Sequence, residues 1–203
     1  MALIPSKGFI MEWFHSNERE QERSKSGLAT TDEIRSAFAE QRHRLYWIAL
    51  LITGDDTLAD LAVVNARALS ANHSSVFRDW LNGWATYATV RAAIREVHGL
   101  IAASAHYLEH SSSDHPDGAV LSDDQVASLR QVDPQEIIVA LDPLARSALV
   151  LRGIQHASIA DSALLLGVPS RVVAVAYGQA LRWNSEHTDT HRALNNHHAD
   201  SRV

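Results

Sequence analysis

The stretch ASIADSALLLGVPS, residues 157 to 170, decides the fold, together with the helical segment that follows it to Trp183. Residues 157 to 163 begin a short helix, residues 164 to 169 turn the chain around a glycine, and residues 170 to 183 form the next helix. Two helices joined by a short glycine-containing turn make a helix-turn-helix. We therefore predict this motif near the C-terminal end of the chain.

The chain before this motif divides into a linker and the start of a helical domain. Residues 111 to 124, SSSDHPDGAVLSDD, gather serine, aspartate, proline and glycine and lose helical periodicity, which indicates a linker. We place the linker at residues 111–133. Pro134 then suits a first helical turn, and the helices that follow are interrupted at Asp142-Pro143. The second domain is expected over residues 134–183.

The N-terminal part predicts a separate helical domain over residues 30–110. Thr31 is expected to cap a first helix that ends at Thr53-Gly54, and a second helix should run from Asp55 to about Leu69. One or two further helices are expected between Val76 and Leu108. The apolar stripe of the second helix is expected to contain Leu58, Leu61, Ala62, Ala66 and Leu69. The fold class is thus all-α, with two small helical domains joined by a linker.

Composition and charge exclude several classes of protein. Hydrophobic residues make up 46% and charged residues 21%, which is typical of a soluble globular chain, and no apolar run is long enough for a membrane span. The absence of cysteine excludes disulfide scaffolds and thiolate metal sites. The net charge of -6 excludes a positive field over the whole molecule. We expect a cytoplasmic protein, with mobile ends at residues 1–29 and 184–203.

Several segments resemble the bacterial RNA polymerase sigma factors of the extracytoplasmic-function group. Residues 140 to 152, ALDPLARSALVLR, resemble the "leucine, proline, x, x, arginine, x, x, leucine, x, leucine, arginine" pattern at the start of that family's second domain. Residues 158 to 169 resemble its helix-turn-helix. Residues 50 to 55 are similar to its "leucine, threonine, glycine, aspartate" turn, and Phe77 with Trp80-Leu81 to the start of its promoter-melting helix. The resemblance covers about residues 31 to 183.

The resemblance implies roles for particular residues. In the family, the first domain binds core RNA polymerase and melted promoter DNA, and the second domain reads an upstream promoter element. The acidic run that contacts the polymerase is replaced here by Leu61-Ala62-Val63-Val64-Asn65. The residues that match are Asp60 and Asn65 for polymerase binding, Arg91 and Arg95 for the melted promoter, and Ser170, Arg171, Gln179 and Arg182 for upstream DNA.

The second helix of the motif is poor in positive charge. Residues 172 to 181 read VVAVAYGQAL, and residues 135 to 183 hold four arginines against three acidic residues, a net of +1. One to three phosphate contacts predict DNA binding that is weak and sensitive to salt, or lost. The apolar run is too broad for one stripe facing a core, so this helix is expected to cover a partner, the other domain, or a second copy of the chain.

Two functions follow from these observations. The first is a sigma-factor-like protein that binds core RNA polymerase and promoter DNA in transcription initiation. The second is a sigma-like regulator or scaffold without DNA binding, whose partner is an anti-sigma factor, another protein, or a second copy in a homo-oligomer. The sequence shows no nucleophile elbow, phosphate loop or carboxylate pair, so no catalysis and no cofactor are expected.

The tryptophans and the histidines each allow a structural and a functional interpretation. Trp47, Trp80 and Trp84 suit either stacking on unpaired bases or the core, and the core is favoured by their helical spacing. Histidines one helical turn apart could chelate a metal ion, but a solvated polar tail is the favoured interpretation and no metal site is expected. The histidines concerned are His106 with His110 and His187 with His191, besides His115 and His197-His198 in segments expected to be mobile.

Overall fold

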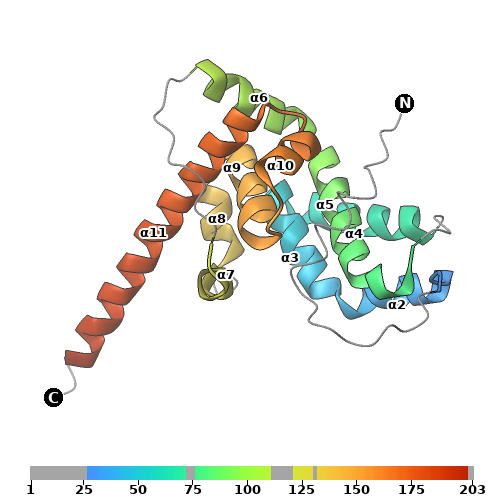
Figure 1. Ribbon diagram of the computed structural model, residues 1–203. Helices are drawn as coiled ribbons and strands as arrows, with labels where there is room; N and C mark the ends of the chain where they lie inside the picture. The colour runs from blue at the N-terminus through green and yellow to red at the C-terminus, as the bar shows by residue number, and fades with distance from the viewer. Residues whose placement is uncertain (1–26, 72–75, 111–120, 130–131, 201–203) are drawn as a thin grey trace.

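Helices make up the whole of the described fold. The computed structural model describes residues 27–71, 76–110, 121–129 and 132–200, with side chains as far as residue 187 except those of Asp123 and Ser128. In this part of the chain there is no strand, and extended pairing is limited to one antiparallel bridge between Leu28 and Phe77. Figure 1 shows the helices gathered around a centre from which the end of the last helix extends. The predicted all-α fold class is confirmed.

The N-terminal half begins with a helix whose start and end differ from the prediction. The capping residue is Thr30, whose side chain accepts from the Glu33 amide (3.2 Å) while the Glu33 carboxylate accepts from the Thr30 amide (2.8 Å). Since Glu33 completes this box only with Thr30, the predicted cap at Thr31 was wrong by one residue. Gln41 then divides the predicted first helix in two. The helices are α2 (Thr31–Glu40), α3 (Arg42–Thr53), α4 (Asp56–Ala71), α5 (Leu81–Glu96) and α6 (His98–His110), with a 3-10 turn η1 (Arg78–Trp80) before α5.

Helix α4 buries only part of the stripe that the sequence predicted: Ala62 and Ala66 are buried, but two of its leucines are not. Its buried residues are small: Ala59, Ala62, Ala66 and Ser70. These side chains let α4 lie close against α3 and α5, whereas Leu61 and Leu69, which were expected in the core, are exposed. The predicted stripe was therefore wrong for both leucines, because close helix packing favoured the small residues over the large ones.

In the C-terminal half, the helices at Pro134 and Ser170 begin where the sequence predicted, whereas the short helix expected from Ala157 begins at Ile159 and one helix lies within the predicted linker. Pro134 and Pro143 each occupy a first helical turn, and the side chains of Asp133 and Asp142 cap the two helices. The last helix is longer than expected: it continues to Asp200 through most of the predicted tail. The elements are α7 (Asp123–Leu129), α8 (Pro134–Ala140), α9 (Pro143–Ala148), a π-helix η2 (Leu149–Ile154), α10 (Ile159–Leu166) and α11 (Ser170–Asp200).

The end of the predicted linker belongs to the core. Residues 111–120 lie outside the described residues, but Leu121, Val126 and Leu129 are all buried. The Leu121 side chain occupies the space beside Gly153, where an added Cβ would lie 2.7 Å from its Cδ1 atom. The missing periodicity of residues 111 to 124 therefore did not exclude burial of the residues just after them.

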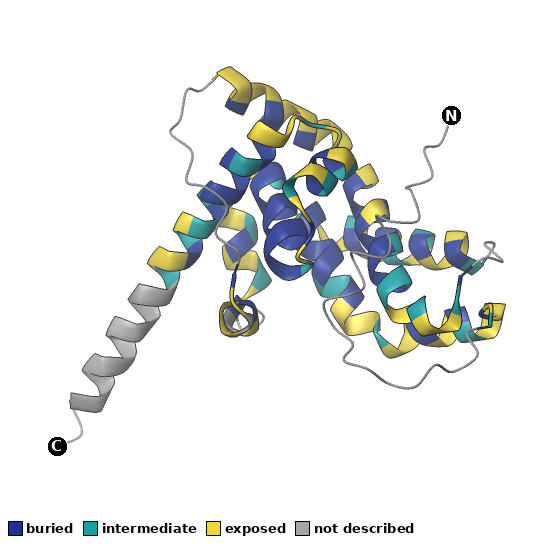
Figure 2. Cartoon of the chain, in the orientation of Figure 1, coloured by how far each residue is buried: buried dark blue, intermediate teal, exposed yellow. Residues whose placement is uncertain are grey.

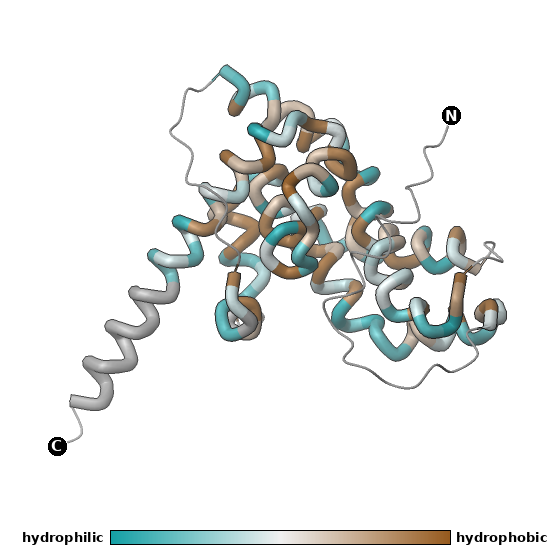
Figure 3. Tube along the Cα trace, in the orientation of Figure 1, coloured by the Kyte–Doolittle hydropathy of each residue, from teal (hydrophilic) through white to brown (hydrophobic). Residues whose placement is uncertain are grey.

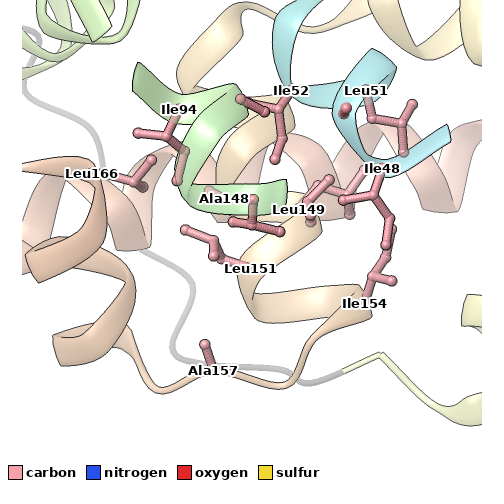
Figure 4. Close-up of a cluster of buried hydrophobic side chains, with 14 of the residues drawn as sticks. Ile48, Leu51, Ile52, Ile94, Ala148, Leu149, Leu151, Ile154, Ala157 and Leu166 are labelled. Atoms are coloured by element: carbon pink, nitrogen blue, oxygen red, sulfur yellow. The ribbon is translucent and has the colours of Figure 1, made fainter. Parts of the chain in front are cut away.

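One hydrophobic core is shared by both halves of the chain. Buried side chains from α3 and α5 lie against those from α9, η2 and α10, as Figure 4 shows. Figure 2 and Figure 3 place the buried and apolar segments together on the inner sides of the helices. The two predicted domains are thus in contact through their interiors. Residues of this shared core include Ile48, Leu51, Ile52, Ile94, Leu149, Leu151 and Leu166.

Arg146 of α9 joins the two halves by hydrogen bonds. Its Nε donates to the Leu51 carbonyl of α3 at 2.9 Å, and its Nη1 donates to the carbonyls of Ile138 (3.0 Å) and Leu141 (2.8 Å). The last carbonyls of a helix lack partners within that helix and carry partial negative charge, which a guanidinium satisfies. Burial lowers the pKa of Arg146, and the Asp142 carboxylate opposes that shift.

Candidate nucleic-acid and protein interfaces

Helices α10 and α11 meet at a steep angle around Gly167. The Ser158 side chain caps α10 by accepting from the Asp161 amide (3.0 Å). Gly167 ends α10 in the left-handed conformation (φ 69°), which glycine adopts without a steric penalty. The axes of α10 and the first part of α11 differ in direction by 104°, and three residues separate the two helices. This angle and this turn length lie within the range of helix-turn-helix motifs.

The first half of α11 is enclosed on several sides. Val172, Val173, Ala176, Tyr177 and Ala180 are buried, and α11 packs against α6, α9, η2 and α10. The sequence left three covers possible for this apolar run: a partner, the other domain, or a second copy of the chain. In the structure the other half of the chain covers part of it, through α6. The breadth of the run follows from having neighbours on more than one side.

The four residues predicted to contact upstream DNA do not form one continuous surface. Ser170, Arg171 and Arg182 are exposed, whereas Gln179 is half-buried. At about 100° per residue, Arg171 and Arg182 point to nearly the same side of α11, about 16 Å apart along its axis. Gln179 lies about 60–80° around the helix from these two arginines, and Ser170 lies on the side opposite Gln179. Arg171 is also engaged: its Nη2 lies 3.5 Å from a carboxylate oxygen of Glu109 on α6.

The other two arginines between residues 135 and 183 are buried. Arg146 bonds to main-chain carbonyls as described above. The Nη1 of Arg152 donates to the Ala157 carbonyl (2.6 Å), and the Arg152 guanidinium lies 5.4 Å from the centre of the Tyr177 ring. Between residues 135 and 183 only Arg171 and Arg182 are therefore available to phosphate groups, which limits direct phosphate contacts by arginine to two.

The residues predicted to contact melted DNA lie on α5. Arg91 and Arg95 are both exposed and one turn apart, so they share a side of the helix. Arg91 lies 5.7 Å from the centre of the Tyr87 ring, and Arg95 lies 4.0 Å from the Glu96 carboxylate. Of the three tryptophans considered for stacking on bases, Trp47 packs against the core and the Trp84 indole donates to the Ser70 hydroxyl at 3.0 Å. The half-buried Trp80 lies edge-on to the Phe77 ring, with ring centres 5.1 Å apart.

The two residues predicted to bind polymerase lie on different sides of α4. Asp60 is exposed, while the Asn65 side-chain amide donates to the Glu96 carboxylate of α5 at 3.5 Å. Five residues turn a helix by about 140°, so the two side chains do not share a surface. Two apolar residues lie beside Asp60 on the outer face, Leu61 (42% exposed) and Val64 (53% exposed), and the exposed Asp56 and Thr57 lie one turn before it. We call Asp60, Leu61 and Val64 the α4 outer face.

The sequence already contained the signal for this outer face. The small residues at positions 59, 62, 66 and 70 repeat every three or four positions, and they would have indicated the side of closest packing. The charges beside this face are mixed: the Asp55 and Asp56 carboxylates lie before it, and the exposed Arg67 lies one turn beyond Val64. The Tyr46 hydroxyl donates to the Asp56 carboxylate at 2.6 Å, and this hydrogen bond, with smaller effects from burial, Asp60 and Asp55, raises the pKa of Tyr46 to about 12.

The histidines form no metal site in the described part of the chain. His110 and His106 are neighbours, with ring centres 4.6 Å apart, and the His110 Nδ1 lies 2.8 Å from the His106 carbonyl oxygen. No group of three or more metal-ligating side chains occurs among the described residues. His187 stacks on Trp183 and lies 3.1 Å from the Glu136 carboxylate; His115 and the side chains of His191, His197 and His198 lie outside the described residues.

No protein-family model, no curated protein and no solved structure matches the chain. Among the described residues, no single helix is both long and apolar enough to cross a membrane. Together, α10 and the first part of α11 reach the required length and composition, but they are bent by 104° and much of this segment of α11 is buried in the core.

Proposed function

We propose that the chain is a sigma-factor-like protein of transcription initiation that binds core RNA polymerase through the α4 outer face and promoter DNA, weakly, through α11. The observation that carries the proposal is the α10–α11 corner. The residues that resemble the helix-turn-helix of these sigma factors form two short-linked helices at 104°, directly after a helix with the family's proline and arginine spacing. Fold alone does not fix function, so binding itself must be tested.

The α4 outer face is the surface that the proposal gives to the polymerase. Exposed apolar side chains flanked by a carboxylate are typical of a protein-binding surface, since apolar contact contributes affinity and charge contributes orientation. Leu61 and Val64 lie on this face together with Asp60, which the resemblance assigns to polymerase contact. The polymerase side of the contact would then be partly apolar and partly basic.

The first experiment measures retention of purified bacterial core RNA polymerase on the immobilised full chain. We expect retention by the natural sequence and at least a roughly tenfold loss in V64R, because a charge placed centrally in an apolar contact removes a large share of its free energy. The matched control is V139R on α8, where Val139 is 85% exposed. No retention of polymerase by the natural sequence, or equal losses in V64R and V139R, would contradict the proposal.

A sigma-like regulator without DNA binding is the second candidate, favoured by the enclosed α11 and the Arg171–Glu109 pair. Its partner would be an anti-sigma factor or another protein. Polymerase retention together with no DNA binding under any condition supports it. DNA binding at about 0.1 M salt that is lost in R171A and R182A supports the first candidate, since each neutralised phosphate adds a salt-dependent increment of affinity.

A further inference from the structure

The chain enters the described structure beside an aromatic part of the N-terminal half. The Gly27 carbonyl accepts a main-chain hydrogen bond from the first residue of η1 at 3.0 Å, and Leu28 forms the antiparallel bridge to Phe77. The Phe77 ring lies edge-on to Trp80, with ring centres 5.1 Å apart. Residues 1–26 lie outside the described residues, and this pairing fixes the point at which they join the fold.

The outward side of α5 begins at the same point. Trp84 follows Trp80 by four positions and Arg91 follows Trp84 by seven, so these side chains point to about the same side of the helix. The half-buried Ala88 lies between Trp84 and the exposed Arg91 on that side. We call Phe77, Trp80, Trp84, Ala88 and Arg91 the α5 outer face. It is aromatic where the chain enters and positively charged at its far end.

The segment before Gly27 has a composition that suits this face. Residues 8 to 14 read GFIMEWF, in which five large apolar side chains accompany one carboxylate, that of Glu12. Apolar side chains gain free energy by leaving water, and the charge of Glu12 is opposite to that of Arg91. Residues 15 to 26, HSNEREQERSKS, contain no large apolar side chain and would serve as a polar spacer.

The spacer is long enough for this contact to form within one chain. Its 12 residues span up to about 40 Å when extended, at about 3.3 Å per residue. The α5 outer face is only about 20 Å long, at about 1.5 Å per residue. A short tether holds a segment at an effective concentration on the order of 1 mM, so a contact with a Kd of about 0.1 mM would be formed in about nine of ten molecules.

We propose that residues 8–14 bind the α5 outer face of their own chain, with apolar side chains against its aromatic end and Glu12 towards Arg91. A nucleic acid or a protein that binds this face must then displace the segment. The docking is independent of the proposed function, because both of its members belong to this chain.

A single introduced thiol tests the docking, because the chain contains no cysteine. A88C places the thiol in the α5 outer face, and its reaction with N-ethylmaleimide is measured in the full chain with the natural segment and with F9S and W13S. We expect the reaction to be about tenfold faster with the two serines, because the thiol reacts only while the segment is detached. The control is A105C, whose thiol is buried where α6 packs against α9 and α11 and should stay slow with either segment.

Three results would overturn the proposal. The first is an equal reaction rate of A88C with the two segments. The second is protection of A88C that disappears on dilution, since the segment would then occupy the α5 outer face of a second copy. The third is an acceleration of A105C as large as that of A88C, since the serines would then have opened the fold. Protection that is lost with F9S and W13S and is independent of protein concentration supports docking within the chain.

Discussion

Arg146 is the residue on which the contact between the two halves depends most directly. It is a buried cation with three main-chain acceptors, the carbonyls of Leu51, Ile138 and Leu141. In R146A these carbonyls lose a charged donor, and those of Leu51 and Leu141 are buried where water does not replace it readily. We expect the free energy of unfolding to fall by about 3 kcal/mol, as measured by urea denaturation.

Two variants check the cause of this loss. R146K keeps the charge, but a lysine ammonium group cannot donate to the carbonyls of α3 and of the end of α8 at the same time, as the planar guanidinium does. R146K should therefore recover only part of the stability. R35A removes an exposed arginine whose ion pair with Asp32 lies in solvent, and it should change stability by about 0.5 kcal/mol or less. If the free energy of unfolding fell no further in R146A than in R35A, the hydrogen bonds of the Arg146 guanidinium would not stabilise the contact between the halves.

At the scale of elements, the segment before α7 is fixed to the π-helix η2 by the contact of Leu121 with Gly153. An added Cβ at position 153 would lie 2.7 Å from Leu121 Cδ1 and 3.3 Å from Leu149 Cδ1. G153A should therefore destabilise the protein by about 1–2 kcal/mol, since overpacking outweighs the gain of about 1 kcal/mol that alanine has over glycine in a helix. The measurement is again urea denaturation.

A double-mutant cycle separates the two opposing effects. In L121A the nearer clash is absent, so adding G153A to that background should be neutral or stabilising. If G153A alone were already neutral or stabilising, Leu121 would not be held against η2, and the sequence-based assignment of residues 121–133 to a linker would be the better description of that segment.

The elements that the sequence predicted well are those whose ends are decided locally. Asp133 with Pro134, Asp142 with Pro143, Ser158 and Gly167 each act within a few residues of themselves, so their effect can be read along the chain. The face that α4 buries, the packing of α6 against α11 and the partner of Arg171 depend on contacts between distant segments. Glu109 and Arg171 are 62 positions apart, and no local pattern predicts their contact. Most of the fold was therefore predictable, whereas the state of the candidate DNA surface was not.

At the scale of the whole molecule, a shared core means that the halves should unfold together. Leu149 is fully buried among side chains of both halves, and L149A should cost about 2–5 kcal/mol. Trp47 and Trp84 report on the N-terminal half and Trp183 on the C-terminal half. In variants where phenylalanine replaces all other tryptophans, L149A should lower the urea midpoint equally for each of these three reporters.

Unequal shifts of the three tryptophan reporters would mean that the two halves do not unfold as one unit. If L149A moved the Trp183 transition alone, the halves would be separate units in contact, and their separation would expose buried faces of both. With one cooperative transition, parting the halves would cost most of the folding free energy, which is too much for a ligand to supply by differential binding.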